Sequence, residues 1–295
     1  MRLETEKEVM ISKQVEACGY SKQIGVYAIA AVVNALQAEG AEEFGLGVRV
    51  AIPAFGYTSR IHGIEKHIRA VCRQRGYELL ELEGKKHPAL RLPQVTVTGI
   101  ARAEQTDKEG KENLLKSGNS IVFTKWLGME GMVRIAEEKE ESLKERFSAG
   151  FLKQIQSYRE SIFAEKEILT AIEQGNVWMD QIGEGGILAA LWRLSAAAGS
   201  GIRVDMKRLP ILQETVEVCE YFHLNPYQLA SAGSFLMVTE NAEALCQRLA
   251  EQGIPASIIG QITDNNDKII QNGEEIRYID RPAREVQYLT YVIPP

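Results

Sequence analysis

Residues 180–210 run D-Q-I-G-E-G-G-I-L-A-A-L-W-R-L-S-A-A-A-G-S-G-I-R-V-D-M-K-R-L-P, and the rest of the chain can be arranged around this stretch. Glycines at 183, 185 and 186 stand directly before residues 187–198, whose apolar side chains recur at helical spacing. The pattern predicts a glycine-rich loop that opens a buried helix. Because the first turn of a helix has unpaired N–H groups and a partial positive charge, such a loop can admit an anion, phosphate above all.

The same glycines have a second interpretation. They would also form a tight turn that lets the helix pack close to its neighbour. The loop matches neither G-x-x-x-x-G-K-[ST] nor G-x-G-x-x-G, so neither nucleotide fingerprint decides the matter. An anion site and a packing turn therefore stand as alternatives.

The composition is that of an ordinary globular protein, with 45% apolar and 25% charged residues. A length of 295 residues favours two domains, and a net charge of −6 argues against nucleic acid as the main partner. The four cysteines are far apart and indicate neither a disulfide framework nor a zinc cluster. No apolar signal segment opens the chain, and the longest apolar run, Val26–Leu36, is too short to span a bilayer. We therefore expect a cytoplasmic protein with no membrane partner.

The first half of the chain is expected to be a mixed α/β domain. Helices are expected weakly over residues 3–20 and strongly over residues 25–38 and 61–75. Strands are expected over residues 48–52, 78–82, 94–100 and 121–125, with a loop over 101–118 and a helix from 133 onward. Residues 147–174 are predicted to be a helical linker region, so the chain is divided into domains 1–146 and 147–295.

The second half is expected to be α+β, which makes the whole chain an α+β protein of two domains. After the glycine-rich loop and its helix, the pattern predicts helices over residues 212–222 and 241–252 and strands over 201–205, 234–239 and 257–263. The dipeptide Asn272-Gly273 stands between two β-prone runs, and it predicts a β-hairpin within residues 268–279.

Three separated motifs of the C-terminal half occur in an order that resembles a known superfamily. They are T-K-W-L-G-M-E-G-M from Thr124, M-D-Q-I-G-E-G-G-I-L-A-A-L-W-R-L from Met179, and E-T-V-E-V-C-E-Y-F-H-L-N-P-Y-Q-L-A-S-A-G-S-F from Glu214. The chain resembles the aminoimidazole ribonucleotide synthetase superfamily, and most of all its hydrogenase-maturation branch, whose members dehydrate a carbamoylated cysteine. This resemblance implies an N-terminal domain that dimerises through its strands and a C-terminal α+β domain that carries the glycine-rich loop.

The resemblance also implies a chemistry and a set of site residues. Members of the superfamily bind ATP with magnesium held by acidic residues, and they transfer a phosphoryl group. Here the implied contacts to nucleotide or phosphate come from the loop, from residues at the junction after residue 124, and from the first buried helix: Asp180, Gly183, Glu184, Gly185, Gly186, Lys125, Gly128 and Asn34. Of these, Asp180 and Glu184 are the carboxylates placed for a metal, and Gly128 has a simple turn as its alternative. No residue is assigned a catalytic role.

The N-terminal half departs from the superfamily pattern. No Gly-Asp-Asp strand precedes Gly25, which implies a domain truncated relative to the family, and Ala35 stands where V-N-D carries its carboxylate. A segment with Lys85, Lys86 and His87 replaces the G-G-[DEH]-T loop, and the chain shows no Pro-Arg-Ile-Cys-like tail. We therefore assign no metal ligands. Two functions remain: an ATP-dependent phosphoryl-transfer enzyme of synthetase, kinase or dehydratase type, and a non-catalytic homodimeric sensor or partner subunit that binds a phosphate-containing small molecule.

Overall fold

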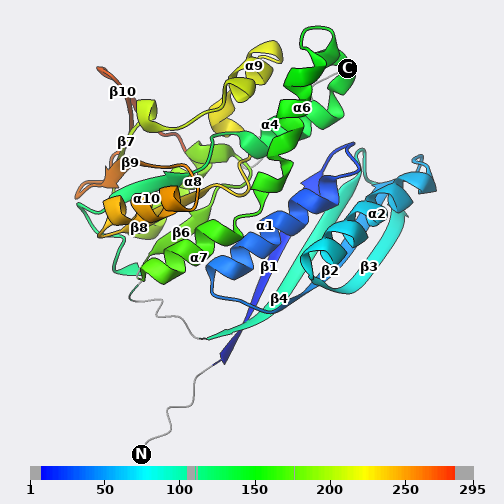
Figure 1. Cartoon of the computed structure of the whole chain (residues 1–295), viewed down its shortest axis with the longest axis horizontal. Helices are drawn as coiled ribbons and strands as arrows, with labels where there is room; N and C mark the ends of the chain where they lie inside the picture. The colour runs from blue at the N-terminus through cyan, green and yellow to red at the C-terminus, as the bar shows by residue number, and fades with distance from the viewer. Residues whose placement is uncertain (1–7, 105–109, 111, 176, 283–295) are drawn as a thin grey trace, which may run out of the picture. The chain divides into compact units, whose positions relative to one another are not determined.

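A computed structural model describes residues 8–104, 110, 112–175 and 177–282. The chain divides into two compact units, Met1–Thr106 and Asp107–Pro295. In the described part of the chain each unit contains one sheet, of four strands in the first and seven in the second, so the expected α+β class and the presence of two folded parts are both found (Figure 1).

The first unit is a four-stranded sheet with two helices on one face. Its elements follow the chain as β1 (Glu8–Cys18), α1 (Ile24–Ala38), β2 (Phe44–Pro53), α2 (Thr58–Arg75), β3 (Glu78–His87) and β4 (Gln94–Glu104). The strand order is β1-β4-β2-β3, with β4 antiparallel to β1 and β2 and with β3 parallel to β2. The two helices lie side by side over the sheet, as Figure 1 shows.

The strongly apolar helix is confirmed as α1, which is buried along nearly its whole length. Its close contact with α2 depends on Gly25, because a Cβ built there would lie only 2.5 Å from the Ile68 side chain. The expected helix over residues 3–20 is wrong for residues 8–18, which form strand β1. Val9, Ile11 and Val15 alternate there with exposed residues such as Met10, and pairing with β4 satisfies the backbone of this strand.

The second unit is built around a mixed seven-stranded sheet in the order β11-β10-β7-β9-β5-β8-β6. Its strands are β5 (Ser120–Thr124), β6 (Trp178–Gln181), β7 (Ile202–Asp205), β8 (Phe235–Thr239), β9 (Ala256–Ile262), β10 (Lys268–Asn272) and β11 (Glu275–Tyr278). Its α-helices are α4 (Met129–Glu138), α5 (Glu140–Lys144), α6 (Ala149–Ser157), α7 (Glu165–Gln174), α8 (Gly186–Ala198), α9 (Gln213–Tyr221) and α10 (Ala242–Glu251), with short 3₁₀ turns η1 (Tyr158–Ile162), η2 (Met206–Arg208) and η3 (Pro226–Gln228).

The division into units differs from the expected boundary between residues 146 and 147. Strand β5 lies in the middle of the second sheet, where it pairs with both β8 and β9. A strand in that place cannot belong to a separate domain, because its backbone hydrogen bonds are made to residues more than a hundred positions later. Residues 112–146 therefore belong to the second unit, and the helical region 147–174 is a part of it.

The core of the second unit joins α8 to the sheet. Ile187, Leu191 and Leu194 of α8 are fully buried against Phe123 of β5 and Leu236 of β8. The predicted hairpin is confirmed, since β10 and β11 pair antiparallel around Asn272 and Gly273. Among the described residues, no helix is both long and apolar enough to cross a lipid bilayer.

Candidate functional site

The glycine-rich loop connects β6 to α8, as the sequence predicts. Gly185 is the residue before the helix and has φ +79°, and Gly186 begins the helix with φ +63°. Both angles are in the left-handed region, which costs an L-residue with a side chain about 1–2 kcal/mol. The last two glycines are therefore required by the backbone of the turn, whatever the loop binds.

The two ends of the loop have different surroundings. A Cβ built on Gly186 would lie 2.7 Å from the carbonyl oxygen of Leu229 and closer still to that of Tyr227, so the start of α8 packs directly against the backbone of η3. A Cβ built on Gly183 would meet no atom within 4 Å. The packing interpretation therefore holds for Gly186, whereas Gly183 leaves open space beside the loop.

The first turn of α8 has backbone N–H groups for which the described residues supply no backbone acceptor. Gly186 donates its N–H to the Gly183 carbonyl at 3.2 Å, and Ala189 donates to the Gly185 carbonyl at 3.4 Å. Within the described part of the chain, no backbone oxygen accepts from the N–H of Ile187 or Leu188, as expected for the first turn of a helix. These two donors and the helix dipole give the amino end of α8 its electropositive character.

The carboxylate of Asp180 is held by an arginine of the helix that follows. Oδ2 of Asp180 accepts hydrogen bonds from Nε and Nη2 of Arg193 at 3.0 and 2.8 Å, and Nη2 also donates to the Gln181 carbonyl at 3.0 Å. An ion pair of this kind neutralises the charge that a metal ion would need. Arg193 is not among the site residues predicted from the sequence, although a basic residue on the helix that follows the loop was a usable signal.

Lys125 is buried and binds protein oxygens. Its ammonium donates to the carbonyls of Ser161 and Phe163 at 2.6 and 2.9 Å, and it forms an ion pair with Glu167 at 2.7 Å. An ammonium has three hydrogens, so these acceptors use all of its donors. In this conformation Lys125 cannot contact a phosphate, and its position ties β5 to the segment that leads into α7.

Gly128 precedes α4 at a crowded junction. Its φ is +66°, its N–H donates to the Ser231 hydroxyl at 2.7 Å, and a Cβ there would lie 3.1 Å from Thr215. The turn interpretation therefore accounts for this residue. The neighbouring Glu130 is buried, with one oxygen bound to Arg134 at 3.2 Å and the other accepting the Ala232 N–H at 2.9 Å.

The remaining expected residues belong to the first unit. Asn34 is fully buried within α1. Lys85, Lys86 and His87 form the exposed end of edge strand β3 instead of a loop, and His87 accepts the Ala89 N–H at 3.2 Å. Among the residues that the structure describes, no group of three or more His, Cys, Asp or Glu side chains could hold a metal ion.

Comparisons with known proteins agree with this architecture. The family described as AIR synthase related protein, C-terminal domain, matches residues 116–272, which is more than half of the chain. The chain belongs to this family. The matched range includes β5, which agrees with a second unit that begins before residue 116.

Similar proteins extend this likeness to both units. The chain is 24% identical to a putative hydrogenase expression/formation protein of Methanocaldococcus jannaschii, over 88% of this chain and 76% of that protein. A crystal structure of E. coli HypE, a hydrogenase maturation protein, superimposes with a TM-score of 0.76 at 18% identity, over 98% of this chain and 89% of that one. A structure of hydrogenase maturation protein HypE in complex with ATP gives a TM-score of 0.73 at 17% identity, over 96% and 88%.

A further relative shares only one region with the chain. The phosphoribosylformylglycinamidine synthase subunit PurL of Methanothermobacter thermautotrophicus is 27% identical over 41% of this chain. The matched region is only 16% of that subunit, so the chain spans a small part of its length.

Proposed function

We propose that this protein binds ATP or another phosphate-containing ligand at the amino end of α8. The open space beside Gly183 supports the proposal, because it adjoins a helix start whose first-turn N–H groups have no backbone acceptor among the described residues. Phosphate oxygens are accepted at such helix ends through backbone N–H groups and the helix dipole. A HypE structure similar in fold contains ATP, which adds support from outside the chain.

The charges near the loop limit which ligands fit. Glu184 lies within the loop and would repel a bare triphosphate at short range. Asp180 is already paired with Arg193, and no cluster of three possible metal ligands is found among the described residues. We therefore derive no step that passes through a protein-held Mg²⁺, and we expect tighter binding of ligands with fewer negative charges.

The second candidate function is a non-catalytic dimeric sensor or partner subunit that keeps the ligand site. The Asp180–Arg193 ion pair and the buried contacts of Lys125 favour it, because both remove groups that phosphoryl transfer would use. If catalysis does occur, it is ATP-dependent phosphoryl transfer of synthetase, kinase or dehydratase type. Release of phosphate or ADP from ATP in the presence of magnesium supports the enzyme, and binding without turnover supports the sensor.

The site is tested by substituting Gly183. Replacing Gly183 by valine places a side chain in the open space, where a Cβ meets no atom within 4 Å and φ is not positive, so the fold should persist. The control is Ala197→Val, which also creates a valine, on the exposed side of α8 near its other end. A ligand at a hundred times its Kd stabilises the folded state by about 2.7 kcal/mol. ATP, ADP and inorganic phosphate should raise the Tm of wild type and of Ala197→Val but not of Gly183→Val; equal protection in all three rejects the site.

Homodimerisation is proposed through the face of the first sheet opposite α1 and α2. Met10 and Ile100 are apolar side chains on this face, with 68% and 41% of their surface exposed. They lie on neighbouring strands, since Ser12 pairs with Ile100 and Met10 with Arg102. Ile100→Glu should convert a dimer into a monomer in sedimentation experiments, while Leu169→Glu, on an exposed position of α7, should leave the mass unchanged.

A further inference from the structure

Strand β9 extends beyond the neighbour with which it pairs on one side. Its pairing with β7 runs from Ile262 to Gly260 and then stops, although β9 continues back to Ala256. The chain leaves the sheet after Asp205 and makes the 3₁₀ turn η2. The first residues of β9 therefore have no strand beside them on the β7 side in the described part of the chain.

The direction of the backbone groups on this open edge follows from the opposite side of β9. The Pro255 carbonyl accepts the N–H of Lys125 at 2.8 Å, so it points toward β5. Successive residues of an antiparallel strand direct their N–H and C=O groups alternately to the two sides. The backbone N–H and C=O groups of Ser257 therefore also point toward β5, while those of Ala256 and Ile258 point toward η2. The Ile258 carbonyl agrees, since Arg208 of η2 donates to it at 3.4 Å.

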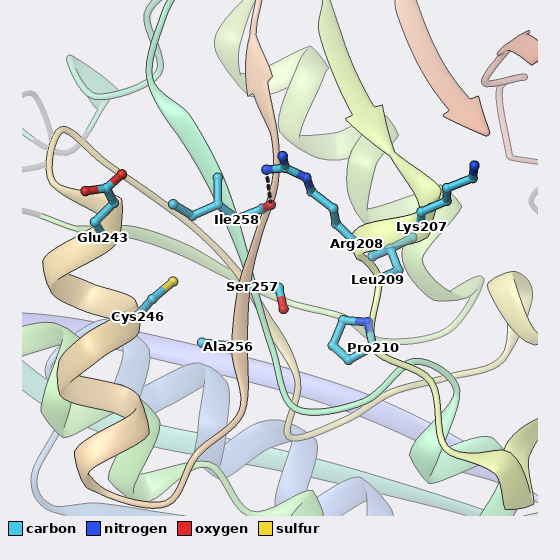
Figure 2. A pocket seen from close by; sticks show the side chains of 9 residues that line it. All are labelled: Lys207, Arg208, Leu209, Pro210, Glu243, Cys246, Ala256, Ser257 and Ile258. Carbon is cyan, nitrogen blue, oxygen red and sulfur yellow. Dashed lines mark hydrogen bonds between the residues drawn. The ribbon is translucent and has the colours of Figure 1, made fainter. Parts of the chain in front are cut away.

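These groups border a groove with a volume of about 660 Å³. The segment Lys207–Pro210 lines one side, the first three residues of β9 line the floor, and Glu243 and Cys246 of α10 line the other side, as Figure 2 shows. Among the described residues, no backbone acceptor outside the sheet is found for the N–H groups of Ala256 and Ile258, and the alternation along β9 directs both groups away from β5. A strand rises about 3.4 Å per residue, so the open edge is about 10 Å long.

The charged residues that line the groove are Lys207, Arg208 and Glu243. The Arg208 guanidinium is mostly exposed, and its contacts are loose, at 3.4 Å to Ile258 and 3.7 Å to Asp205. It can therefore exchange these contacts for a better acceptor. Lys207 does not compete for that role, because Figure 2 shows its ammonium pointing away from β9.

We propose that this groove binds an extended segment of a partner protein, which adds a strand to the open edge of β9 and places an acidic side chain against Arg208. The N–H groups of Ala256 and Ile258, which point away from β5, are spaced as a strand requires, and a peptide backbone supplies the matching carbonyls. Leu209, Pro210 and the Ile258 side chain form apolar walls for the alternate side chains of the segment.

The backbone part of the proposal is tested on the full chain with the peptide Thr-Val-Glu-Val-Thr-amide, labelled with fluorescein at its amino terminus, by fluorescence anisotropy. Ala256→Pro removes the N–H that faces the groove and leaves the β5 ladder intact, because Ala256 directs no backbone group toward β5. Ala256→Val is the matched control and keeps the N–H. We expect binding to weaken roughly fivefold to tenfold in the proline variant and less than about twofold in the valine variant, as for the loss of one hydrogen bond.

The same peptide with alternate amides N-methylated cannot form the backbone hydrogen bonds of an added strand and should not bind to wild type. This measurement tests strand addition even if Ala256→Pro fails to fold. The contribution of the Arg208 charge is tested with Arg208→Glu. Wild type should bind the peptide with glutamate more tightly than the same peptide with lysine in its place, and Arg208→Glu should reverse that preference. Equal binding of the methylated and unmethylated peptides, or of neither at millimolar concentration, overturns the proposal. A charge preference that Arg208→Glu leaves unchanged also overturns it, because the acidic side chain would then lie elsewhere.

Discussion

Replacing Gly186 by alanine tests how closely the amino end of α8 packs against η3. The new methyl group would lie 2.7 Å from the carbonyl carbon of Gln228 and 2.7 Å from the carbonyl oxygen of Leu229. These are backbone atoms, so no flexible side chain can move aside to make room. The substitution also forces an L-residue into a backbone with φ +63°.

Both effects destabilise the second unit. The left-handed conformation costs about 1–2 kcal/mol, and moving η3 away from α8 costs about 1–3 kcal/mol more. Gly186→Ala should therefore lower the free energy of unfolding by roughly 2–5 kcal/mol, which is a large part of the roughly 5–15 kcal/mol typical of a domain. Gly183→Ala, in the same loop, should leave stability unchanged or raise it by up to about 1 kcal/mol, because the unfolded chain loses freedom.

Urea titration followed by tryptophan fluorescence measures this difference. The three tryptophans, Trp126, Trp178 and Trp192, all lie in the second unit, so the signal reports on the unit that contains the loop. With a urea slope of about 2–3 kcal/mol per molar, the Gly186→Ala midpoint should fall by about 1–2 M. Midpoints of the two variants that agree within about 0.2 M would refute the close packing of α8 on η3, and with it the division of the loop into a packed end and an open end.

Three further predictions concern buried polar and thiol groups. Lys125→Met should destabilise the second unit by about 3–5 kcal/mol in urea titration, because Glu167 is left as an unpaired buried charge, and adding Glu167→Gln should recover part of the loss. Glu130→Leu should cost about 2–4 kcal/mol, because a buried guanidinium and a buried N–H lose their acceptor, and a loss below about 0.5 kcal/mol would contradict the hydrogen bonds assigned here. Burial raises the pKa of the Cys219 thiol from the ordinary 9.0 to about 12 and that of Cys72 to about 11. Iodoacetamide at pH 8 should therefore leave both thiols unmodified in the native protein, as measured by mass spectrometry. The unfolded chain loses these protons above about pH 9 and the folded chain does not, so the free energy of unfolding should fall as the pH rises above about 9.

Local signals predicted much of the secondary structure. The apolar run over 25–38 forms α1, and Asn272-Gly273 forms the turn between β10 and β11. Both signals act within a few residues, through burial of a helix that is apolar on all sides and through the left-handed backbone that Gly273 adopts at φ +66°. The expected helix over 3–20 failed because its competitor is non-local. Residues 8–18 are stabilised as a strand by β4, which begins at Gln94.

The site shows the same division between local and distant effects. The sequence predicted that glycines at 185 and 186 would open a helix, and the positive φ angles of both residues give the reason. It could not predict that Arg193 would bind Asp180, or that Ser161, Phe163 and Glu167 would surround Lys125. Those partners depend on how helices and strands pack in space. The identity of a charged residue does not indicate which group will pair with it in the folded protein.

By itself the sequence determined the family, the α+β class and the turn that begins α8. Motif order can be read directly from the chain, and the backbone conformation of a turn depends on residues that are neighbours in sequence. Tertiary structure alone decided that residues 112–146 fold with the second unit, since the place of β5 depends on its pairing with β8 and β9. It also decided which end of the glycine loop is open, and that β9 continues past the end of β7. Each of these depends on distances between segments far apart in the chain, and those distances are set only when the sheet assembles.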